Sequence, residues 1–224
     1  MEVLNFFVQF VLHIDVHLGQ IISTYGVLTY LILFLVIFIE TGLVFVPFLP
    51  GDSLLFAAGA FSAIGSLNIF VLLGLMMVAA VLGDTSNYWI GHFFGEELIL
   101  NPKVPLKKEH IEKTKAFFDK HGGKTIILAR FVPIVRTFAP FVAGIGKMNY
   151  GKFISYNIIG GVAWVLIATL SGFFFGNIPF VKDNFSFVIL AIIIISILPM
   201  VFEITKNKKN SGENLTTMEK DDLK

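Results

Sequence analysis

Cysteine is absent from this chain of 224 residues, and arginine occurs only at Arg130 and Arg136. Without cysteine there are no disulfides, no thiol chemistry and no cysteine-ligated metal. Charged residues make up only 15% of the sequence, whereas hydrophobic residues make up 55% and the mean hydropathy is +0.80. Several apolar runs approach the length that a helix needs to cross a bilayer. The composition predicts an integral membrane protein.

Positive charge is also missing from the first half of the chain, where no lysine or arginine precedes Lys103. Lysines then cluster in the segment 101–124, and three more, Lys206, Lys208 and Lys209, follow the last apolar run. Because lysine and arginine favour cytoplasmic loops, both regions are predicted to be cytoplasmic.

Apolar periodicity and its interruptions predict an all-α fold. Amphipathic helices over 4–22 and 107–121 are expected to lie along the membrane interface. Spanning helices are expected from Leu67 to about Gly95, from Phe153 to about Gly176, and over 185–202.

The two arginines lie in a segment, 129–144, that is otherwise almost entirely apolar. It also contains Pro133, Pro140 and Gly144, which are expected to break any helix there. A charge at membrane depth is costly and normally faces a protein interior or a wet cavity, where protein or water also satisfies non-helical backbone. The pattern favours a re-entrant segment that presents two positive charges to a buried anion. The alternative is an ordinary loop from which both arginines snorkel to the lipid surface.

A second broken segment carries matching negative charge. The apolar run 26–46 is interrupted near its deep end by Glu40. The residues that then end the helix are Pro47, Pro50, Gly51 and Asp52. The chain is predicted to turn back there into a short helix over 54–64. Glu40 is interpreted as functional, whereas a simple helix N-cap remains an alternative for Asp52.

The predicted helix that begins at Leu67 carries a polar face within the membrane. Spacings of three, four and seven residues place on it Asp84, Asn87, Tyr88 and Gly91. This face is predicted to look inward. Asp84 is expected to bind a proton or cation or to accept a bond from an arginine, unless it is simply solvated near the membrane exit.

The two halves of the sequence repeat. Each reads as an amphipathic surface helix, a broken hairpin with proline and charge, and a long glycine-containing spanning helix, over residues 4–95 and 107–176. If 101–124 is cytoplasmic, the two hairpins enter from opposite sides and meet within the membrane, as in inverted-repeat transporters. The chain is interpreted as one membrane domain over 1–202, with an added spanning helix at 185–202, and a polar tail at 203–224 that is predicted to be disordered.

Three blocks resemble the signature blocks of the DedA family of bacterial membrane proteins, namely Glu40–Asp52, Gly83-Asp84 with Tyr88 and Gly91, and Arg130–Gly144. This family shares its core domain with the eukaryotic VTT scramblases. The resemblance implies two opposed re-entrant hairpins, a location in the bacterial cell membrane with several spans, and lipid translocation that in several members depends on the proton gradient. It also implies that the essential acidic pair is Glu40 and Asp52 and the essential arginine pair is Arg130 and Arg136.

The resemblance and the charges together predict a transporter that moves a lipid phosphate. The undecaprenyl phosphate carrier is the first candidate, and a phospholipid such as phosphatidylethanolamine is the alternative. A planar guanidinium can bind two phosphate oxygens at once, so Arg130 and Arg136 are expected to bind the phosphate. The acidic residues are expected to couple protons or to gate, namely Glu40, Asp52 and Asp84.

Other functions stay open. The acids and arginines could form only a structural ion-pair latch, or the acids could serve a proton-coupled antiporter of small cations. An enzyme is not expected, because no arrangement of nucleophile and base accompanies the arginine segment. His13 and His17 have the spacing of metal ligands on a helix, but no third ligand recurs nearby, so neither a metal nor a cofactor is predicted. The expected partners are membrane lipids and protons, with a homo-oligomer open and no nucleic acid.

Overall fold

The computed structural model describes residues 14–43, 51–100, 108–176 and 178–179. Within these ranges every regular element is helical, which confirms the all-α prediction for this part of the chain. The elements are α2 (Ile14–Tyr25), α3 (Leu28–Gly42), α4 (Gly51–Ala63), α5 (Ile69–Leu100), α6 (Lys108–His121), the 3-10 turn η1 (Gly122–Lys124), α7 (Thr125–Ala129), α8 (Pro133–Ile145) and α9 (Tyr150–Phe175).

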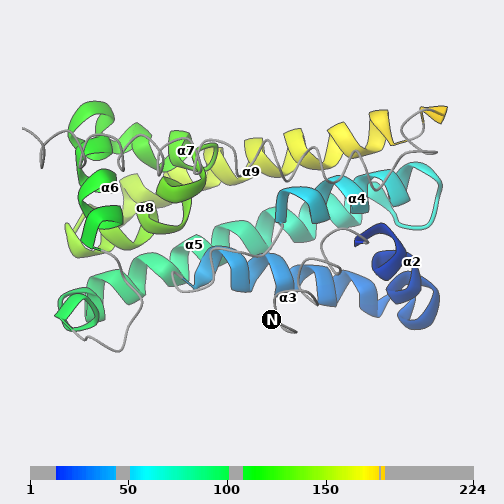
Figure 1. Ribbon diagram of the computed structural model, residues 1–224, viewed down its shortest axis with the longest axis horizontal. Helices are drawn as coiled ribbons and strands as arrows, with labels where there is room; N and C mark the ends of the chain where they lie inside the picture. The colour runs from blue at the N-terminus through cyan, green and yellow to red at the C-terminus, as the bar shows by residue number, and fades with distance from the viewer. Residues whose placement is uncertain (1–13, 44–50, 101–107, 177, 180–224) are drawn as a thin grey trace, which may run out of the picture.

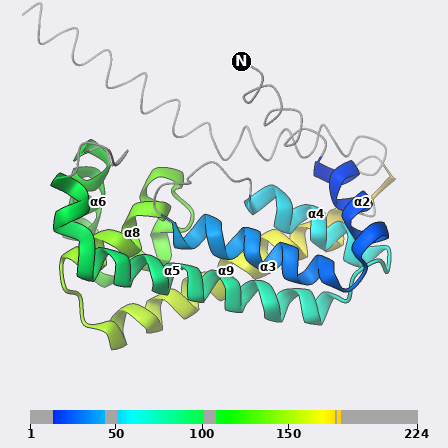
Figure 2. The same ribbon diagram turned by 90° about the horizontal axis from the view of Figure 1, so that it is seen from below.

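Two long helices, α5 and α9, run along the length of the molecule (Figure 1). They are apolar enough to cross a membrane over Ile69–Gly95 and Tyr150–Phe175. The helix α3 packs on α5 and α4 packs on α9, while α6, α7 and α8 gather at the other end of the bundle from α2 (Figures 1 and 2). The two long helices lie close to the predicted ones.

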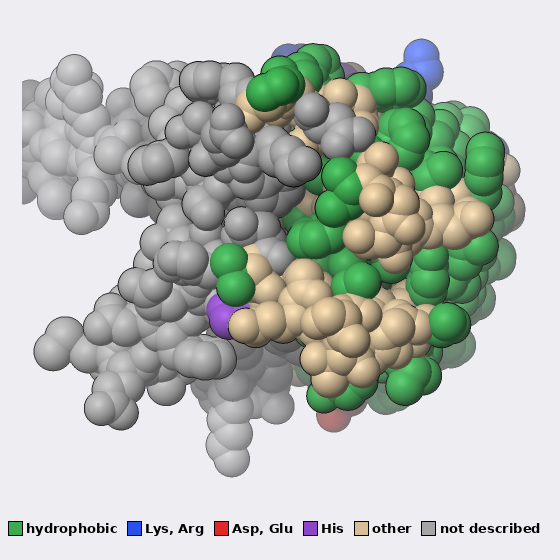
Figure 3. All heavy atoms as spheres, turned by 90° about the vertical axis from the view of Figure 1, so that its right-hand side faces the viewer, with side chains coloured by type: hydrophobic (Ala, Val, Ile, Leu, Met, Phe, Trp, Pro, Cys, Tyr) green, Lys and Arg blue, Asp and Glu red, His purple; other side chains and the backbone are tan. Residues whose placement is uncertain are grey.

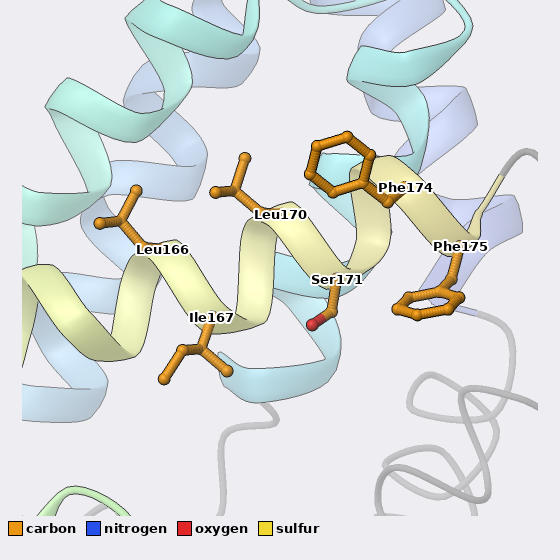
Figure 4. Close-up of a pocket in the computed structure, with 6 residues that line it drawn as sticks. All are labelled: Leu166, Ile167, Leu170, Ser171, Phe174 and Phe175. Atoms are coloured by element: carbon orange, nitrogen blue, oxygen red, sulfur yellow. The ribbon is translucent and has the colours of Figure 1, made fainter.

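The outer surface of the long helices is apolar, with Phe70, Phe93 and Phe174 all well exposed. In the end view of Figure 3, the described surface consists mostly of hydrophobic side chains and of backbone and other uncharged side chains, with few charged groups. On α9, Leu166, Ile167 and four neighbouring side chains line a shallow groove of about 280 Å³ that is almost wholly apolar (Figure 4). A soluble protein rarely exposes so much contiguous apolar surface, whereas lipid tolerates it.

Glycines let the helix backbones touch at two crossings. A Cβ on Gly59 of α4 would lie 2.0 Å from the carbonyl oxygen of Thr169, and one on Gly172 of α9 would lie 1.9 Å from that of Phe56. The crossing of α5 with α8 is equally tight, since a Cβ on Gly91 or on Gly144 would lie 2.2 or 2.1 Å from a backbone oxygen of the partner helix. Small residues at such crossings are typical of packed membrane helices.

The interruption in the arginine segment differs from the prediction. The helix stops at Ala129 and resumes at Pro133, and Val132 between them is extended, as the residue before a proline prefers. Pro133 thus starts α8, where its missing N–H costs nothing. The prediction that Pro140 and Gly144 break the helix is wrong, because both lie inside α8. Pro140 removes only one backbone hydrogen bond, and packing of α8 against α5 and α6 keeps the helix intact.

Of the proline and glycine helix breaks predicted before α4, only Gly51 falls within the described residues. Gly51 is the first residue of α4. Pro47 and Pro50, the first half of the amphipathic helix at 4–22, the helix at 185–202 and the tail at 203–224 lie outside the described residues.

Replacing Gly172 by alanine is expected to destabilise the protein by about 1–3 kcal/mol, because the new methyl group would overlap the backbone of α4. Gly74→Ala is the matched control, since its added Cβ would meet no atom of another described element within 4 Å. Thermal unfolding in detergent should give a lower Tm for Gly172→Ala and an unchanged or slightly higher Tm for Gly74→Ala. Equal Tm values for the two variants would contradict the close crossing of α4 and α9.

Candidate functional site

The two arginines are buried near the middle of the bundle. Arg130 follows α7 directly, and Arg136 lies in the first turn of α8, so the break between these helices separates them. Arg130 is 3% exposed, and the side chain of Arg136 is 12% exposed. The interpretation in which both arginines snorkel to the lipid surface is therefore wrong.

Arg136 is held by two carboxylates from different helices. Its Nη2 donates to Oε1 of Glu40 at 3.0 Å. Its Nη1 donates to both oxygens of Asp52, at 3.2 Å to Oδ1 and 3.1 Å to Oδ2. The helices that supply these groups are α8, α3 and α4, so two neighbouring helices of the first half of the chain and one helix of the second half meet at one guanidinium.

The first residues of α4 help to position both acids that bind Arg136, namely Asp52 in this helix and Glu40 in α3. Asp52 lies in the first turn of α4, where the partial positive charge of the helix terminus favours a carboxylate. Its oxygens accept from the side chains of Arg136 and Trp164, and α4 already begins at Gly51, so the interpretation of Asp52 as a simple N-cap is wrong. Glu40 packs directly against Gly51, whose Cβ would come 1.8 Å from Oε2 of Glu40. A side chain at position 51 would force this carboxylate out of its present position.

Arg130 has a different set of partners. Its Nη2 donates to Oδ2 of Asp84 at 2.6 Å, to Oδ1 of Asn157 at 2.7 Å and, more weakly, to the carbonyl oxygen of Ala80 at 3.3 Å. Its Nε and Nη1 are buried and have no hydrogen-bond partner in the part of the chain that the structure describes. Gly161 lies beside the guanidinium and makes room for it on α9.

A tryptophan connects the two arginine centres. Trp164 of α9 is buried, its ring lies 4.2 Å from Cζ of Arg136 and 5.8 Å from Cζ of Arg130, and its Nε1 donates to Oδ1 of Asp52 at 2.6 Å. The sequence predictions gave neither Trp164 nor Asn157 a role. The sequence did offer a signal for a polar contact there, because an asparagine and a tryptophan lie on the same face of a largely apolar predicted helix.

The polar face of α5 looks inward, as predicted. Asp84, Asn87 and Tyr88 are all buried. The amide of Asn87 donates to the carbonyl oxygen of Thr137, and the hydroxyl of Tyr88 donates to that of Met148, so both residues tie α5 to the second half of the chain. Of the interpretations of Asp84, pairing with an arginine is confirmed and simple solvation is wrong, whereas binding of a proton or cation stays a prediction.

Formal charge does not balance at this site. The ion pairs join Arg130 and Arg136 to three carboxylates, those of Glu40, Asp52 and Asp84. If all five groups are ionised, the carboxylates exceed the guanidinium groups by one. If one carboxylate took up a proton or was replaced by another anion, at least two negative charges would still lie beside the two guanidinium groups.

Among the described residues, no group of three or more His, Asp or Glu side chains could hold a metal ion. His13 lies outside these residues, and no third ligand accompanies His17 among them.

Comparison with known proteins gives consistent matches. The VTT domain model matches residues 49–174. The chain is 54% identical to Protein DedA of Escherichia coli strain K12 over 212 residues, which cover 93% of this chain and 97% of that protein. It is 48% identical to an uncharacterized membrane protein of Mycobacterium tuberculosis, covering 74% of each chain, and 35% identical to Inner membrane protein YqjA of E. coli K12, covering 67% of this chain and 69% of YqjA. No solved structure matches the chain.

Neutralising Asp84 is expected to destabilise the protein, because Arg130 would keep a buried charge without a counterion. For Asp84→Asn the loss is up to about 3–5 kcal/mol, the cost of breaking a buried ion pair. Glu112→Gln removes one exposed acid and is the control. Thermal unfolding in detergent compares the two.

Adding Arg130→Gln to Asp84→Asn should recover part of the lost stability, since neither partner is then charged. Equal Tm values for Asp84→Asn and Glu112→Gln would contradict the importance of the pair.

Proposed function

Because the chain belongs to the DedA family of VTT-domain membrane proteins, located in the bacterial cell membrane with several spans, we propose that it moves a lipid phosphate across the bilayer. The undecaprenyl phosphate carrier is the first candidate. The observation that carries the proposal is the guanidinium of Arg136, buried among apolar helices and held by two carboxylates. In this proposal no bond of the lipid is made or broken, so the protein is a transporter and not an enzyme.

The geometry at Arg136 suits exchange of carboxylate for phosphate. Its two terminal nitrogens each face an anionic oxygen, one of Glu40 and one of Asp52. A phosphate group also presents several anionic oxygens, and a guanidinium can bind two of them in parallel. The protein thus keeps a phosphate-binding group charged and oriented inside the membrane, while the lipid tail stays in the surrounding hydrocarbon.

The exposed fractions suggest the side from which the phosphate arrives. The side chain of Asp52 is 32% exposed, compared with 12% for Arg136 and 7% for Glu40. Asp52 is therefore the most exposed of the three groups, and we expect the phosphate to approach Arg136 from its side.

Arg130 supplies further binding capacity. Two of its buried nitrogens, Nε and Nη1, have no hydrogen-bond partner among the described residues. Buried donors of this kind are costly unless something binds them. A phosphate oxygen or a water molecule that accompanies the lipid would satisfy them, while Asp84 and Asn157 keep Nη2 in place.

Proton uptake by the acidic residues is compatible with this proposal. When a phosphate joins the two arginines, the negative charge at the site exceeds the positive charge by a wider margin. Uptake of a proton by Glu40, Asp52 or Asp84 would restore the balance and couple lipid movement to the proton gradient. A small-cation antiporter is less well supported, because each of these acids already pairs with an arginine that would repel the cation.

The packing supports the proposed inverted repeat. The short helix of each half packs on the long helix of the other half, α4 on α9 and α8 on α5, and each crossing uses a pair of glycines. We propose that the segments around α3–α4 and α7–α8 are re-entrant hairpins that enter from opposite sides. Their broken ends would then present Asp52 and Arg136 to each other near the middle of the membrane.

Translocation of labelled undecaprenyl phosphate in proteoliposomes tests the proposal, with phosphatidylethanolamine measured in parallel and with or without an imposed pH gradient. The wild type should move the carrier lipid, and Arg136→Lys should lower the rate at least about tenfold, because an ammonium group cannot bind two oxygens in a fixed plane. Lys120→Gln, which removes an exposed positive charge on α6, is the control and should transport normally.

Other outcomes redirect the proposal. Movement of phosphatidylethanolamine alone would assign the protein to phospholipids. No lipid movement by a correctly folded preparation, or full transport by Arg136→Lys, would refute binding of phosphate by the guanidinium.

A further inference from the structure

Trp164 is placed to act on the charged groups rather than only to fill space. It is 3% exposed, and its ring faces Arg136 at 4.2 Å while its indole nitrogen donates to Asp52. An indole N–H is a donor only, so it can partner a carboxylate but can never compete with a phosphate for a guanidinium. Among the described residues, the side chains that donate to Asp52 are those of Trp164 and Arg136.

The bonds of Asp52 differ in length. Its Oδ1 lies 2.6 Å from the indole nitrogen of Trp164, whereas its distances to Nη1 of Arg136 are 3.1 and 3.2 Å. Charge-assisted N–H···O bonds usually measure about 2.7–2.9 Å. The indole bond is thus the tighter one, and the shared bond to the guanidinium is the looser one.

Helix packing explains which bond is fixed. Asp52 and Trp164 belong to α4 and α9, whose backbones are in close contact where Gly59 and Gly172 lie at the helix crossing. Arg136 belongs to α8, which packs closely on α5 at a different crossing. The Asp52–Trp164 bond therefore lies within one closely crossed pair of helices, while the Asp52–Arg136 bond joins two pairs, which also pack on each other through α5 and α9.

Exchange of ligands at Arg136 creates a specific problem. A phosphate that displaces Asp52 would leave a partly buried carboxylate without its cation, and an unpaired polar group of this kind is costly. The indole N–H is already in place to hold that carboxylate.

We propose that Trp164 is a positioning residue that keeps Asp52 satisfied while Arg136 exchanges it for the phosphate of the transported lipid, and that Asp52 rather than Glu40 is the carboxylate that leaves. This inference rests on the proposed function. It assigns a role to the tryptophan and an order to the exchange.

Binding of decyl phosphate, a single-chain lipid phosphate, to the purified full-length protein tests the role of the indole by titration calorimetry. Trp164→Phe keeps an aromatic face for Arg136 but loses the N–H, and should weaken binding about tenfold, the effect of one hydrogen bond to a charged group. Asp52→Asn should bind at least as tightly as the wild type, because the competing charge is gone.

The double variant Trp164→Phe/Asp52→Asn separates positioning from mere packing. It should bind like Asp52→Asn alone, because the indole has no displaced carboxylate left to hold. If Trp164→Phe weakens binding equally in both backgrounds, or in neither, the inference is overturned. No binding of decyl phosphate by the folded wild type would instead refute the proposed function, and the inference with it.

Fluorescence gives a measurement that leaves Trp164 intact and so does not depend on the folding of Trp164→Phe. The chain has two tryptophans, and the other, Trp89, is partly exposed on α5 among aromatic rings away from the arginines. In Trp89→Phe the emission of Trp164 should change as decyl phosphate binds, and decanol should have no effect. An unchanged emission at saturating decyl phosphate would overturn the inference.

Discussion

Compensation of two positive charges inside an apolar bundle is the constraint on which the rest of the structure depends. An ionised side chain taken out of water costs several kcal/mol unless partners with good geometry surround it. Here the partners come from most of the central helices, with Glu40 from α3, Asp52 from α4, Asp84 from α5 and Asn157 from α9. The helices must therefore approach one another closely enough for short side chains to reach a common centre.

Glycine makes that approach possible. Where α4 crosses α9 and α5 crosses α8, an added methyl group would collide with backbone oxygen atoms, so the helix axes are as close as the peptide groups allow. Gly51 leaves space for the carboxylate of Glu40, and Gly161 lets the guanidinium of Arg130 lie close to α9. The same residues that hold the bundle together thus set the distances at the charged site, and packing and function share one geometry.

Transport requires that these interactions be strong enough to keep a charge buried and weak enough to be replaced. Each of the two arginines meets one part of this requirement. Arg130 has short bonds to Asp84 and Asn157, whereas Arg136 has longer bonds to two acids, one of which has a second donor in Trp164. Within the proposed function, Arg130 is the more fixed group and Arg136 is the group whose partners change.

The sequence by itself determined the class of protein, the approximate limits of α5 and α9, and the identity of the charged residues, because long apolar runs and isolated charges within them have few physical explanations. It did not determine the path of the backbone at Pro140, since one lost hydrogen bond ends a helix or is tolerated depending on what packs around it. The pairing of each arginine and the position of Trp164 were likewise decided only by the tertiary structure. These contacts join residues far apart in the chain, and their geometry depends on how closely glycine lets the helices cross.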